Sequence, residues 1–342
     1  MDRKEFARQV KEGGVRGAYL FEGPEENIKA AALSQLRKAL LPEGLEELNE
    51  SVMDAPSADE LIAAAETLPF LADKRLVVVR DHPALSGRQE GDDRLCDYLA
   101  HVPDTCVIVF FHRGKADARK KLYGAIKKSG QIVTFLPLGD AELNSWIIRA
   151  FSEGGKQCDS RTASLLSFTV GSDTALLRAE IAKLISLCGE RDVVTEDDVR
   201  AVATRSVECT VFDMVDAVVA GQEGKAFALM RDMLATGSDR LGILAMLLRQ
   251  YRLLRQVKIM QYEKKAPQEI KQQLGVPPFA AERCIRQAQR FSGGEVRDAV
   301  DACVDTEYRV KSGRINLEGS LEALLLRLFA AHRAKAATTP DR

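Results

Sequence analysis

The segment PSADELIAAAETLPFLADKRLVVV, residues 56–79, decides how the first part of the chain is interpreted. Ser57 and Glu60 have the spacing of a capping box, in which the hydroxyl accepts from the Glu60 amide and the carboxylate accepts from the Ser57 amide. A helix therefore begins after Ser57. Pro69 ends it, because the residue before a proline is pushed out of the helical region. The β-branched run 75–79 then predicts a buried strand.

Two bulky apolar residues, Phe70 and Leu71, lie between this helix and this strand, where connecting turns are usually polar. On a rigid, exposed turn they would form a compact hydrophobic plug for a pocket of another protein. They could also fold back into the local core. The segment by itself favours neither interpretation.

Around this segment, residues 1–139 alternate between strand and helix patterns. Strands are predicted at 17–23, 49–53, 76–79, 105–111 and 132–135, and further helices at 25–40, 92–101 and 116–128. Strands that alternate with helices predict a parallel sheet covered on both faces. The apolar runs of the third and fourth strands place these two in the sheet interior. Residues 1–139 are therefore predicted to form an α/β domain of the P-loop type.

The connection after the first strand has the position of a nucleotide-binding P-loop, whose pattern is G-x-x-x-x-G-K-[ST]. With Gly23 as the first glycine, the second glycine falls on Ile28. Lys29 then takes the place of the lysine, and Ala30 that of the hydroxyl residue. Ile28 puts a side chain where the backbone must approach phosphate, Ala30 has no hydroxyl for Mg²⁺, and Pro24 removes an amide donor. We therefore expect the scaffold of a P-loop ATPase without its chemistry, and no nucleotide cofactor.

Cysteine usage indicates reduced thiols and no metal site. The chain has few histidines and no C-x-x-C pair that could complete a zinc site. The cysteines are dispersed at positions 96, 106, 158, 188, 209, 284 and 303. Together with a charged N-terminus that has no signal-peptide pattern, this predicts a cytoplasmic protein.

From Asp140 onward only helix patterns follow. Four short helices are predicted within 140–207 and form a small bundle, interpreted as a lid on the first domain. Ser160-Arg161 in this bundle is interpreted as a helix start rather than an arginine finger. Residues 208–342 are predicted to form an all-helical third domain, with helices at 212–220, 225–235, 240–264, 280–291, 294–310 and 317–336. The segment LEALLLRLF, 321–329, is apolar nearly all round, so we expect it to be buried within a domain or in an assembly interface.

Two groups of residues in the third domain are candidates for contact with nucleic acid. Arginines three apart on the helix 240–264 could line a phosphate backbone, although a solvated face is the more common role of such a pattern. An aromatic residue near two basic ones could meet single-stranded nucleic acid. The first group is Arg249, Arg252 and Arg255, and the second is Tyr308, Lys311 and Arg314.

Composition and charge limit the possible classes of protein. At 342 residues, with 46% hydrophobic and 29% charged residues, the chain is an ordinary globular protein of more than one domain. No apolar run approaches the about 20 residues of a membrane span. The net charges are −2 for 1–139, −3 for 140–207 and +4 for 208–342. This excess of positive charge is too small for a self-standing DNA-binding domain, so any contact with DNA is expected within an assembly.

In its joint order of motifs the chain resembles the delta subunit family of the bacterial DNA polymerase III clamp loader. The resemblance runs over nearly the whole length, and no single piece of it is specific. The motifs are YLFEGPE at 19–25, ETLPFLADKRLVVV at 66–79, DARKKLYGAIKKSG at 117–130, SDTALLRAEIAKL at 172–184, VFDMVDAV at 211–218, RQYRLLRQVK at 249–258 and KSG at 311–313.

The resemblance implies an AAA+-like first domain that binds no nucleotide, a helical lid and an all-helical collar. It implies a non-catalytic component of a DNA-directed DNA polymerase holoenzyme that binds the beta sliding clamp and helps to hold the ring open. Its implied partners are the ATP-hydrolysing gamma/tau subunits, the delta-prime subunit and primed-template DNA. The clamp contact falls on the segment that we call the apolar turn, Leu68, Pro69, Phe70 and Leu71. The chain reads Pro-Phe-Leu where some members of the family carry Leu-Phe.

Two functions from other classes remain as alternatives. An active AAA+-type ATPase would bind nucleotide, which dialysis against labelled ATP detects. A self-standing DNA-binding regulator would bind duplex DNA with a steep dependence on salt.

Overall fold

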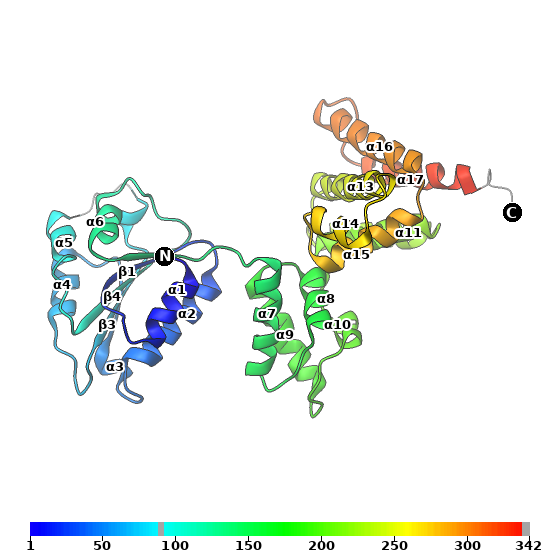
Figure 1. Cartoon of the computed structure of the whole chain (residues 1–342). Helices are drawn as coiled ribbons and strands as arrows, with labels where there is room; N and C mark the ends of the chain where they lie inside the picture. Colours follow the sequence, from blue (N-terminus) through cyan, green and yellow to red (C-terminus); the bar gives the residue numbers. More distant parts are fainter. Residues whose placement is uncertain (88–91, 337–342) are drawn as a thin grey trace. The chain divides into compact units, whose positions relative to one another are not determined.

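The computed structural model describes residues 1–87 and 92–336. The chain forms two compact units, Met1–Pro137 and Leu138–Arg342 (Figure 1). The first contains the sheet, and the second is helical and includes both the predicted lid and the predicted collar; the division into three domains stays a prediction. Within the described residues, no helix combines the length and the apolar character needed to cross a bilayer.

Five parallel strands form the sheet of the first unit, as the alternating pattern predicts. They are β1 Gly17–Glu22, β2 Glu50–Asp54, β3 Arg75–Arg80, β4 Cys106–Phe111 and β5 Gln131–Thr134. Their order is β2-β3-β4-β1-β5, so the apolar strands β3 and β4 lie in the interior. In a parallel sheet every chain segment enters at the amino ends of the strands and leaves at their carboxyl ends. The connection before β3 carries the apolar turn and lies at the amino ends of the strands. The connection after β1 lies at their carboxyl ends, on the opposite side of the sheet.

Helices cover both faces of this sheet (Figure 1). Those of one face are α4 Ala58–Glu66, α5 Asp93–Tyr98 and α6 Lys121–Ser129, and those of the other are α1 Arg3–Lys11 and α2 Glu26–Leu40. The first three share a buried core with Val77, Ile108 and Phe110. On the opposite face, the ring of Phe6 on α1 packs edge-on against those of Tyr19 and Phe21. The alternation of side chains along β1 supplies both cores.

Two short helical turns complete the first unit. The single turn α3, Glu46–Asn49, leads into β2, and η1, Pro83–Leu85, follows β3. The predicted capping box is confirmed, because the amide of Glu60 donates to Ser57 Oγ at 3.3 Å and the amide of Ser57 donates to Glu60 Oε2 at 2.8 Å.

The second unit is helical, apart from an isolated β-bridge between Gln157 and Val193 among its described residues. Its first four are α7 Asp140–Glu153, α8 Ser160–Val170, α9 Thr174–Cys188 and α10 Glu196–Val202. The others are α11 Val207–Val219, α12 Glu223–Ala235, α13 Arg240–Tyr262, α14 Pro267–Gln273, α15 Pro278–Gln289, α16 Gly293–Lys311 and α17 Ser320–Ala336. In α17, four leucines and Phe329 are buried in the core that α11 to α16 also form, whereas Leu326 is exposed. This helix is thus buried within its own unit, one of its two expected environments.

Some helix limits differ from those predicted. The helix predicted at 116–128 begins only at Lys121, because the Asp117 carboxylate accepts from the amide and the guanidinium of Arg119 and holds this stretch in a turn. The helix predicted at 212–220 already begins at Val207, where Ser206 caps it. The short helices α3 and α14 were not predicted, since four and seven residues show too little periodicity.

Candidate functional site

The apolar turn is exposed. Helix α4 ends at Glu66, ahead of Pro69, and β3 begins at Arg75. Between them Leu68 is 77% exposed, Phe70 54% and Leu71 75%. The side chains do not fold back into the local core, so the structure excludes the second of the two interpretations that the sequence left open, and the first stays a prediction.

Hydrogen bonds hold the backbone of this turn in place. Asn49, at the end of α3, donates from Nδ2 to the carbonyl oxygen of Phe70 at 2.9 Å and accepts from the Phe70 amide through Oδ1 at 2.7 Å. Leu71 has a φ of +50°, a conformation that non-glycine residues seldom adopt. The turn is therefore a defined structure that presents apolar side chains to water.

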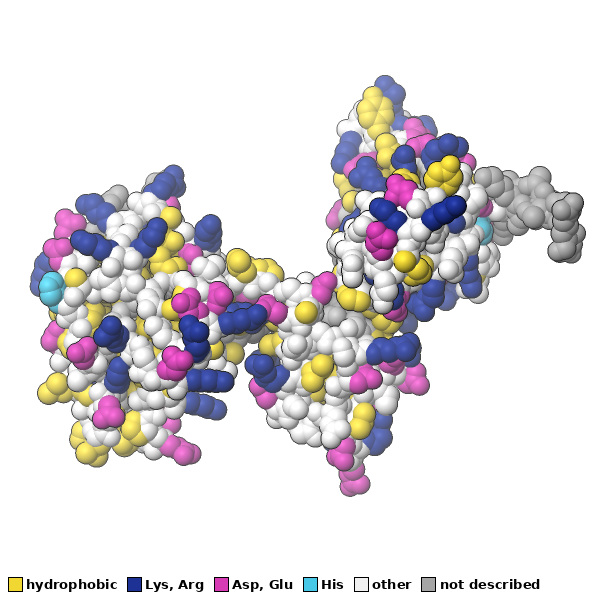
Figure 2. Space-filling model, in the orientation of Figure 1, with side chains coloured by type: hydrophobic (Ala, Val, Ile, Leu, Met, Phe, Trp, Pro, Cys, Tyr) yellow, Lys and Arg dark blue, Asp and Glu magenta, His cyan; other side chains and the backbone are white. Residues whose placement is uncertain are grey.

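Further apolar side chains are exposed on the elements beside the turn. Leu48 on α3 is 54% exposed, and Val52 on the edge strand β2 is 47% exposed. Figure 2 shows hydrophobic side chains gathered at the end of the first unit where Figure 1 places α3. Contiguous exposed apolar side chains mark an interaction surface more often than an isolated exposed leucine does.

At the carboxyl ends of the strands, the lysine of the P-loop position is bonded to other groups of the chain. Lys29 is fully buried, and its Nζ donates to Glu26 Oε1 and to the carbonyl oxygen of His112, each at 2.6 Å. It also lies over the ring of Phe111, 5.2 Å from the centroid. The lysine that would hold phosphate in a P-loop is thus neutralised by a carboxylate.

The backbone donors around Gly23 are also engaged. The amide of Gly23 donates to the carbonyl of Gly114 at 2.6 Å, and that of Glu25 donates to the carbonyl of Phe135 at 3.4 Å. Gly23 has a φ of +114°, and a Cβ at this position would clash with the Phe135 backbone. The glycine is required for this close approach of two chain segments, in which both amides are bonded to carbonyl oxygens.

The acidic residue after β3 has a structural role. Asp81, with a φ of +42°, accepts from the amide of Arg113 through Oδ1 at 2.7 Å. His82 and His112 follow β3 and β4 and are both buried, and this burial lowers the pKa of each imidazole. No group of three or more metal-ligating side chains that could hold an ion is found among the described residues.

The arginines predicted to lie along one helix are all on α13. Arg249 forms an ion pair with Glu208 at 2.7 Å. Arg252 and Arg255 are exposed, and neither forms a salt bridge with any residue that the structure describes. Two of the three arginines therefore keep their charge available.

The aromatic and basic group lies at the end of α16. The guanidinium of Arg314 lies over the ring of Tyr308, 5.1 Å from its centroid, and Tyr308 is 55% exposed. Lys311 pairs with Glu307 at 2.6 Å. The structure brings Tyr308 and Arg314 together in an exposed stack, while the charge of Lys311 is partly neutralised.

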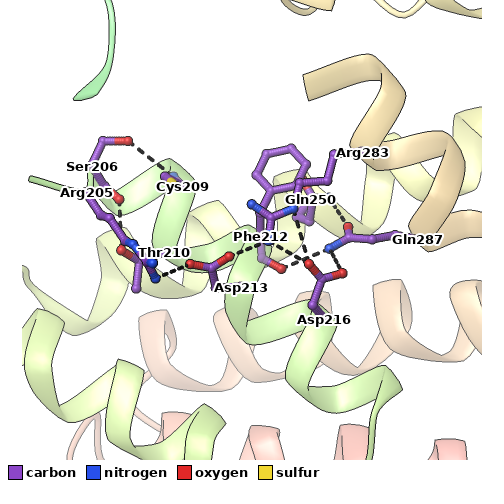
Figure 3. Close-up of polar contacts among 10 residues, drawn as sticks. All are labelled: Arg205, Ser206, Cys209, Thr210, Phe212, Asp213, Asp216, Gln250, Arg283 and Gln287. Carbon is purple, nitrogen blue, oxygen red and sulfur yellow. Dashed lines mark hydrogen bonds and ion pairs between the residues drawn. The ribbon is translucent and has the colours of Figure 1, made fainter. Parts of the chain in front are cut away.

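The helices α8 and α10 meet α11 and α15 at a pocket of about 260 Å³. Arg283 on α15 is one of its lining residues and reaches Asp213 and Asp216 of α11 (Figure 3). Its guanidinium also lies over the rings of Phe168 and Phe212. Arg161, at the start of α8, pairs with Glu196 at 2.7 Å, so the predicted helix start is confirmed and this arginine has a local partner.

Comparison with known proteins gives the family. The family model described as "DNA polymerase III, delta subunit" matches residues 19–136, and the model for the C-terminal domain of the delta subunit matches residues 208–328. The chain belongs to the DNA polymerase III delta subunit family. It is similar over 331 residues to the DNA polymerase III subunit delta of Bacillus subtilis, at 27% identity, which covers 94% of this chain and 95% of that protein.

A further relative and a solved structure are also similar to the chain. A probable DNA polymerase III subunit delta of Aquifex aeolicus is 25% identical over 240 residues, 67% of each chain. The solved structure of the Bacillus subtilis DNA clamp loader delta protein has 26% identity and a TM-score of 0.50, over 96% of this chain and 99% of that one. The predicted fold class and the predicted clamp-loader family are confirmed, and the chain is a delta-type component of the machinery of DNA replication.

Asn49 is the residue of this site that the sequence did not reveal. A single asparagine before a strand is common, and only its position opposite a turn 21 residues later distinguishes it. The capping pattern and the apolar turn itself could be found from the sequence, because both are local.

Proposed function

We propose that this chain binds a ring-shaped sliding clamp through the apolar turn and helps to hold the ring open while it is placed on primed DNA. The observation that carries the proposal is the exposure of Leu68, Phe70 and Leu71 on a turn whose backbone is fixed. Membership of the clamp-loader delta family supplies the partner.

The apolar turn has enough surface for such a contact. Burying one large apolar side chain contributes about 1.5–3 kcal/mol, and the best-placed residues carry most of the free energy of an interface. Opening a ring also requires that the chain bind the open form more tightly than the closed form, since equal binding would shift no equilibrium. Because the turn is already ordered, little of the binding free energy is spent on fixing it.

We propose further that the chain hydrolyses no ATP and that the loader also contains gamma/tau-type ATPases and a delta-prime subunit. The first part is supported by the P-loop position, where Lys29 is neutralised by Glu26 and the amides of Gly23 and Glu25 bond to carbonyl oxygens, and the second by membership of the delta subunit family. Incubation of the isolated chain with labelled ATP tests the absence of hydrolysis, and equilibrium dialysis tests the absence of nucleotide binding. Saturable binding with release of labelled phosphate would overturn this part of the proposal.

We propose that the exposed basic residues of the second unit contact the primed-template DNA within the assembled loader. Arg252 and Arg255 would contact the phosphate backbone, whereas the stack of Tyr308 on Arg314 suits an unpaired base. Arg249 and Lys311 have acidic partners and are expected to contribute less.

The clamp contact is tested by surface-plasmon binding of the cognate sliding clamp to the full chain and to a Phe70→Ala, Leu71→Ala double variant. We expect the double variant to lose about a hundredfold or more in affinity, because two exposed anchors are removed from the centre of the contact. Leu176→Ala is the matched control, since Leu176 is similarly exposed, at 57%, but lies on α9 in the other unit.

Equal binding by the parent and by a folded double variant would place the contact elsewhere on the chain. Loss of binding in the Leu176→Ala control as well would mean that any exposed leucine matters, and the assignment to the apolar turn would fail.

A further inference from the structure

The side chain of Asn49 is completely buried although it is polar and belongs to a single helical turn. Asn49 ends α3 directly before β2, and Phe70 lies a few residues before β3, the strand that pairs with β2. Both residues are therefore at the amino ends of neighbouring parallel strands, where the chain enters the sheet. This topology brings together residues that are 21 positions apart.

Asn49 uses both ends of its amide. Its Oδ1 accepts from the backbone amide of Phe70 at 2.7 Å, and its Nδ2 donates to the Phe70 carbonyl oxygen at 2.9 Å. The second proton of Nδ2 goes to the carbonyl oxygen of Leu45 at 3.0 Å. One side chain thus satisfies both backbone groups of Phe70 and links them to α3.

Only asparagine has this combination of groups at this length. Aspartate lacks the two donors and would place a buried negative charge beside two carbonyl oxygens, while alanine would leave the Phe70 amide without its acceptor. A buried polar group that loses its hydrogen-bond partner destabilises the folded state, because it cannot bond to water instead. Position 49 therefore requires the donor and acceptor groups of asparagine, and a side chain of similar volume without them would not hold the turn.

The turn needs such a support. Leu71 has a φ of +50°, and three of the four side chains of the apolar turn are mostly in water, so burial does little to fix their positions. Without the Asn49 bonds, residues 68–71 would sample other conformations. A partner would then have to order the turn on binding, which weakens the observed affinity.

We infer that Asn49 is a positioning residue for the apolar turn, which it holds in the conformation that a sliding clamp binds. This inference rests on the proposed function of the turn. Asn49 itself makes no contact with the partner, since its side chain is buried.

The test compares clamp binding by surface plasmon resonance for Asn49→Ala and Asn49→Asp, each with and without Phe70→Ala. Alone, Asn49→Ala is expected to weaken binding about tenfold, by the loss of a preorganised turn. In the Phe70→Ala background the same change should weaken binding less than in the parent, because the largest of the side chains that Asn49 positions is no longer there. Asn49→Asp should be at least as harmful as Asn49→Ala.

A second measurement does not depend on the clamp. Hydrogen exchange of the Phe70 amide in the free chain should become about tenfold faster or more in Asn49→Ala, because this amide loses its acceptor. The control variant is Asn144→Ala, which removes an amide that also donates to a backbone carbonyl, that of Ser160 at 2.9 Å, in the other unit. It should leave the Phe70 amide and clamp binding unchanged.

The outcomes separate the two proposals. Loss of binding in Phe70→Ala with full binding and slow exchange in Asn49→Ala would refute the role of Asn49 and leave the clamp contact standing. Unchanged binding in Phe70→Ala would remove the clamp contact, whereas fast exchange in Asn49→Ala would still show that Asn49 holds the turn. Equal losses from Asn49→Ala in both backgrounds would mean that it acts on general stability and not through Phe70.

Discussion

Lys29 has the sequence position of a P-loop lysine, but its hydrogen-bond partners give it a structural role. It occupies the lysine position of the P-loop pattern, yet it is buried and bonds to Glu26 and to the His112 carbonyl. An ammonium group in such a place stabilises the fold only as long as those partners are present. The lysine is therefore expected to matter for stability and not for nucleotide binding.

Replacing Lys29 by methionine tests this expectation. The variant should lower the free energy of unfolding by about 2–4 kcal/mol, because Glu26 and the His112 carbonyl lose their buried cation. Lys38→Met on the same helix is the control, since Lys38 is exposed and its replacement should change stability by less than about 0.5 kcal/mol. Urea unfolding measures both. A stable Lys29→Met variant would contradict the structural role.

At the scale of single elements, the ends of β3 and β4 each carry a buried histidine. Burial lowers the pKa of His82 below 6.5, although a hydrogen bond with the backbone of Pro56 opposes the shift. For His112, burial also lowers the pKa, against the attraction of Asp81. In both cases the unfolded chain binds a proton more readily than the folded chain.

This gives a pH dependence with a definite sign. The free energy of unfolding should be highest above about pH 7.5 and should fall as the pH drops through 6.5, because the unfolded imidazoles take up protons more readily than the folded ones. A His82→Asn, His112→Asn double variant should show a flatter profile over the same window. A parent protein that is equally stable above about pH 7.5 and below about pH 6.5 would refute the assignment.

Arg283 links helix α15 to helix α11 through ion pairs. Removal of this side chain leaves two carboxylates, Asp213 and Asp216, without their shared cation and takes away its contact with two aromatic rings. Arg283→Ala should therefore lower the free energy of unfolding by about 3–5 kcal/mol. Arg297→Ala, at an exposed ion pair of 3.9 Å, should change it by less than about 1 kcal/mol. Chemical unfolding followed by circular dichroism distinguishes the two.

At the scale of the whole molecule, the proposed contact with the clamp and the proposed contact with the template DNA lie in different units. The apolar turn belongs to Met1–Pro137, and the arginines of α13 belong to Leu138–Arg342. Changes in one unit should therefore leave the other contact intact, provided that both units stay folded.

The template contact is tested in the assembled loader with primed DNA and fluorescence anisotropy. An Arg252→Ala, Arg255→Ala variant should weaken binding and reduce the slope of log affinity against log salt by about 2, one for each phosphate contact. Arg249→Ala should reduce the slope less, because Glu208 already neutralises this arginine. Equal slopes for the parent and the double variant would exclude Arg252 and Arg255 from the DNA contact.

Features that depend on neighbours along the chain could be predicted from the sequence. The alternation of strands and helices predicted the five parallel strands, the pattern Ser57-x-x-Glu60 predicted a helix start, and the residues Ile28 and Ala30 predicted a degenerate P-loop. These signals follow from local geometry, so they survive without tertiary contacts. Periodicity missed elements that are too short to show it, such as α3 and α14, and it misplaced the starts of α6 and α11.

Which side chains are exposed, and what holds them, depends instead on the packed structure. The backbone of Phe70 is hydrogen-bonded to Asn49, 21 residues away, and one of the two partners of Lys29 is a carbonyl 83 residues away. Such pairs are set by strand order and register, because parallel strands bring distant segments to a common edge of the sheet. Burial and hydrogen bonding are properties of the packed chain, whereas periodicity and capping are properties of the order of residues along it.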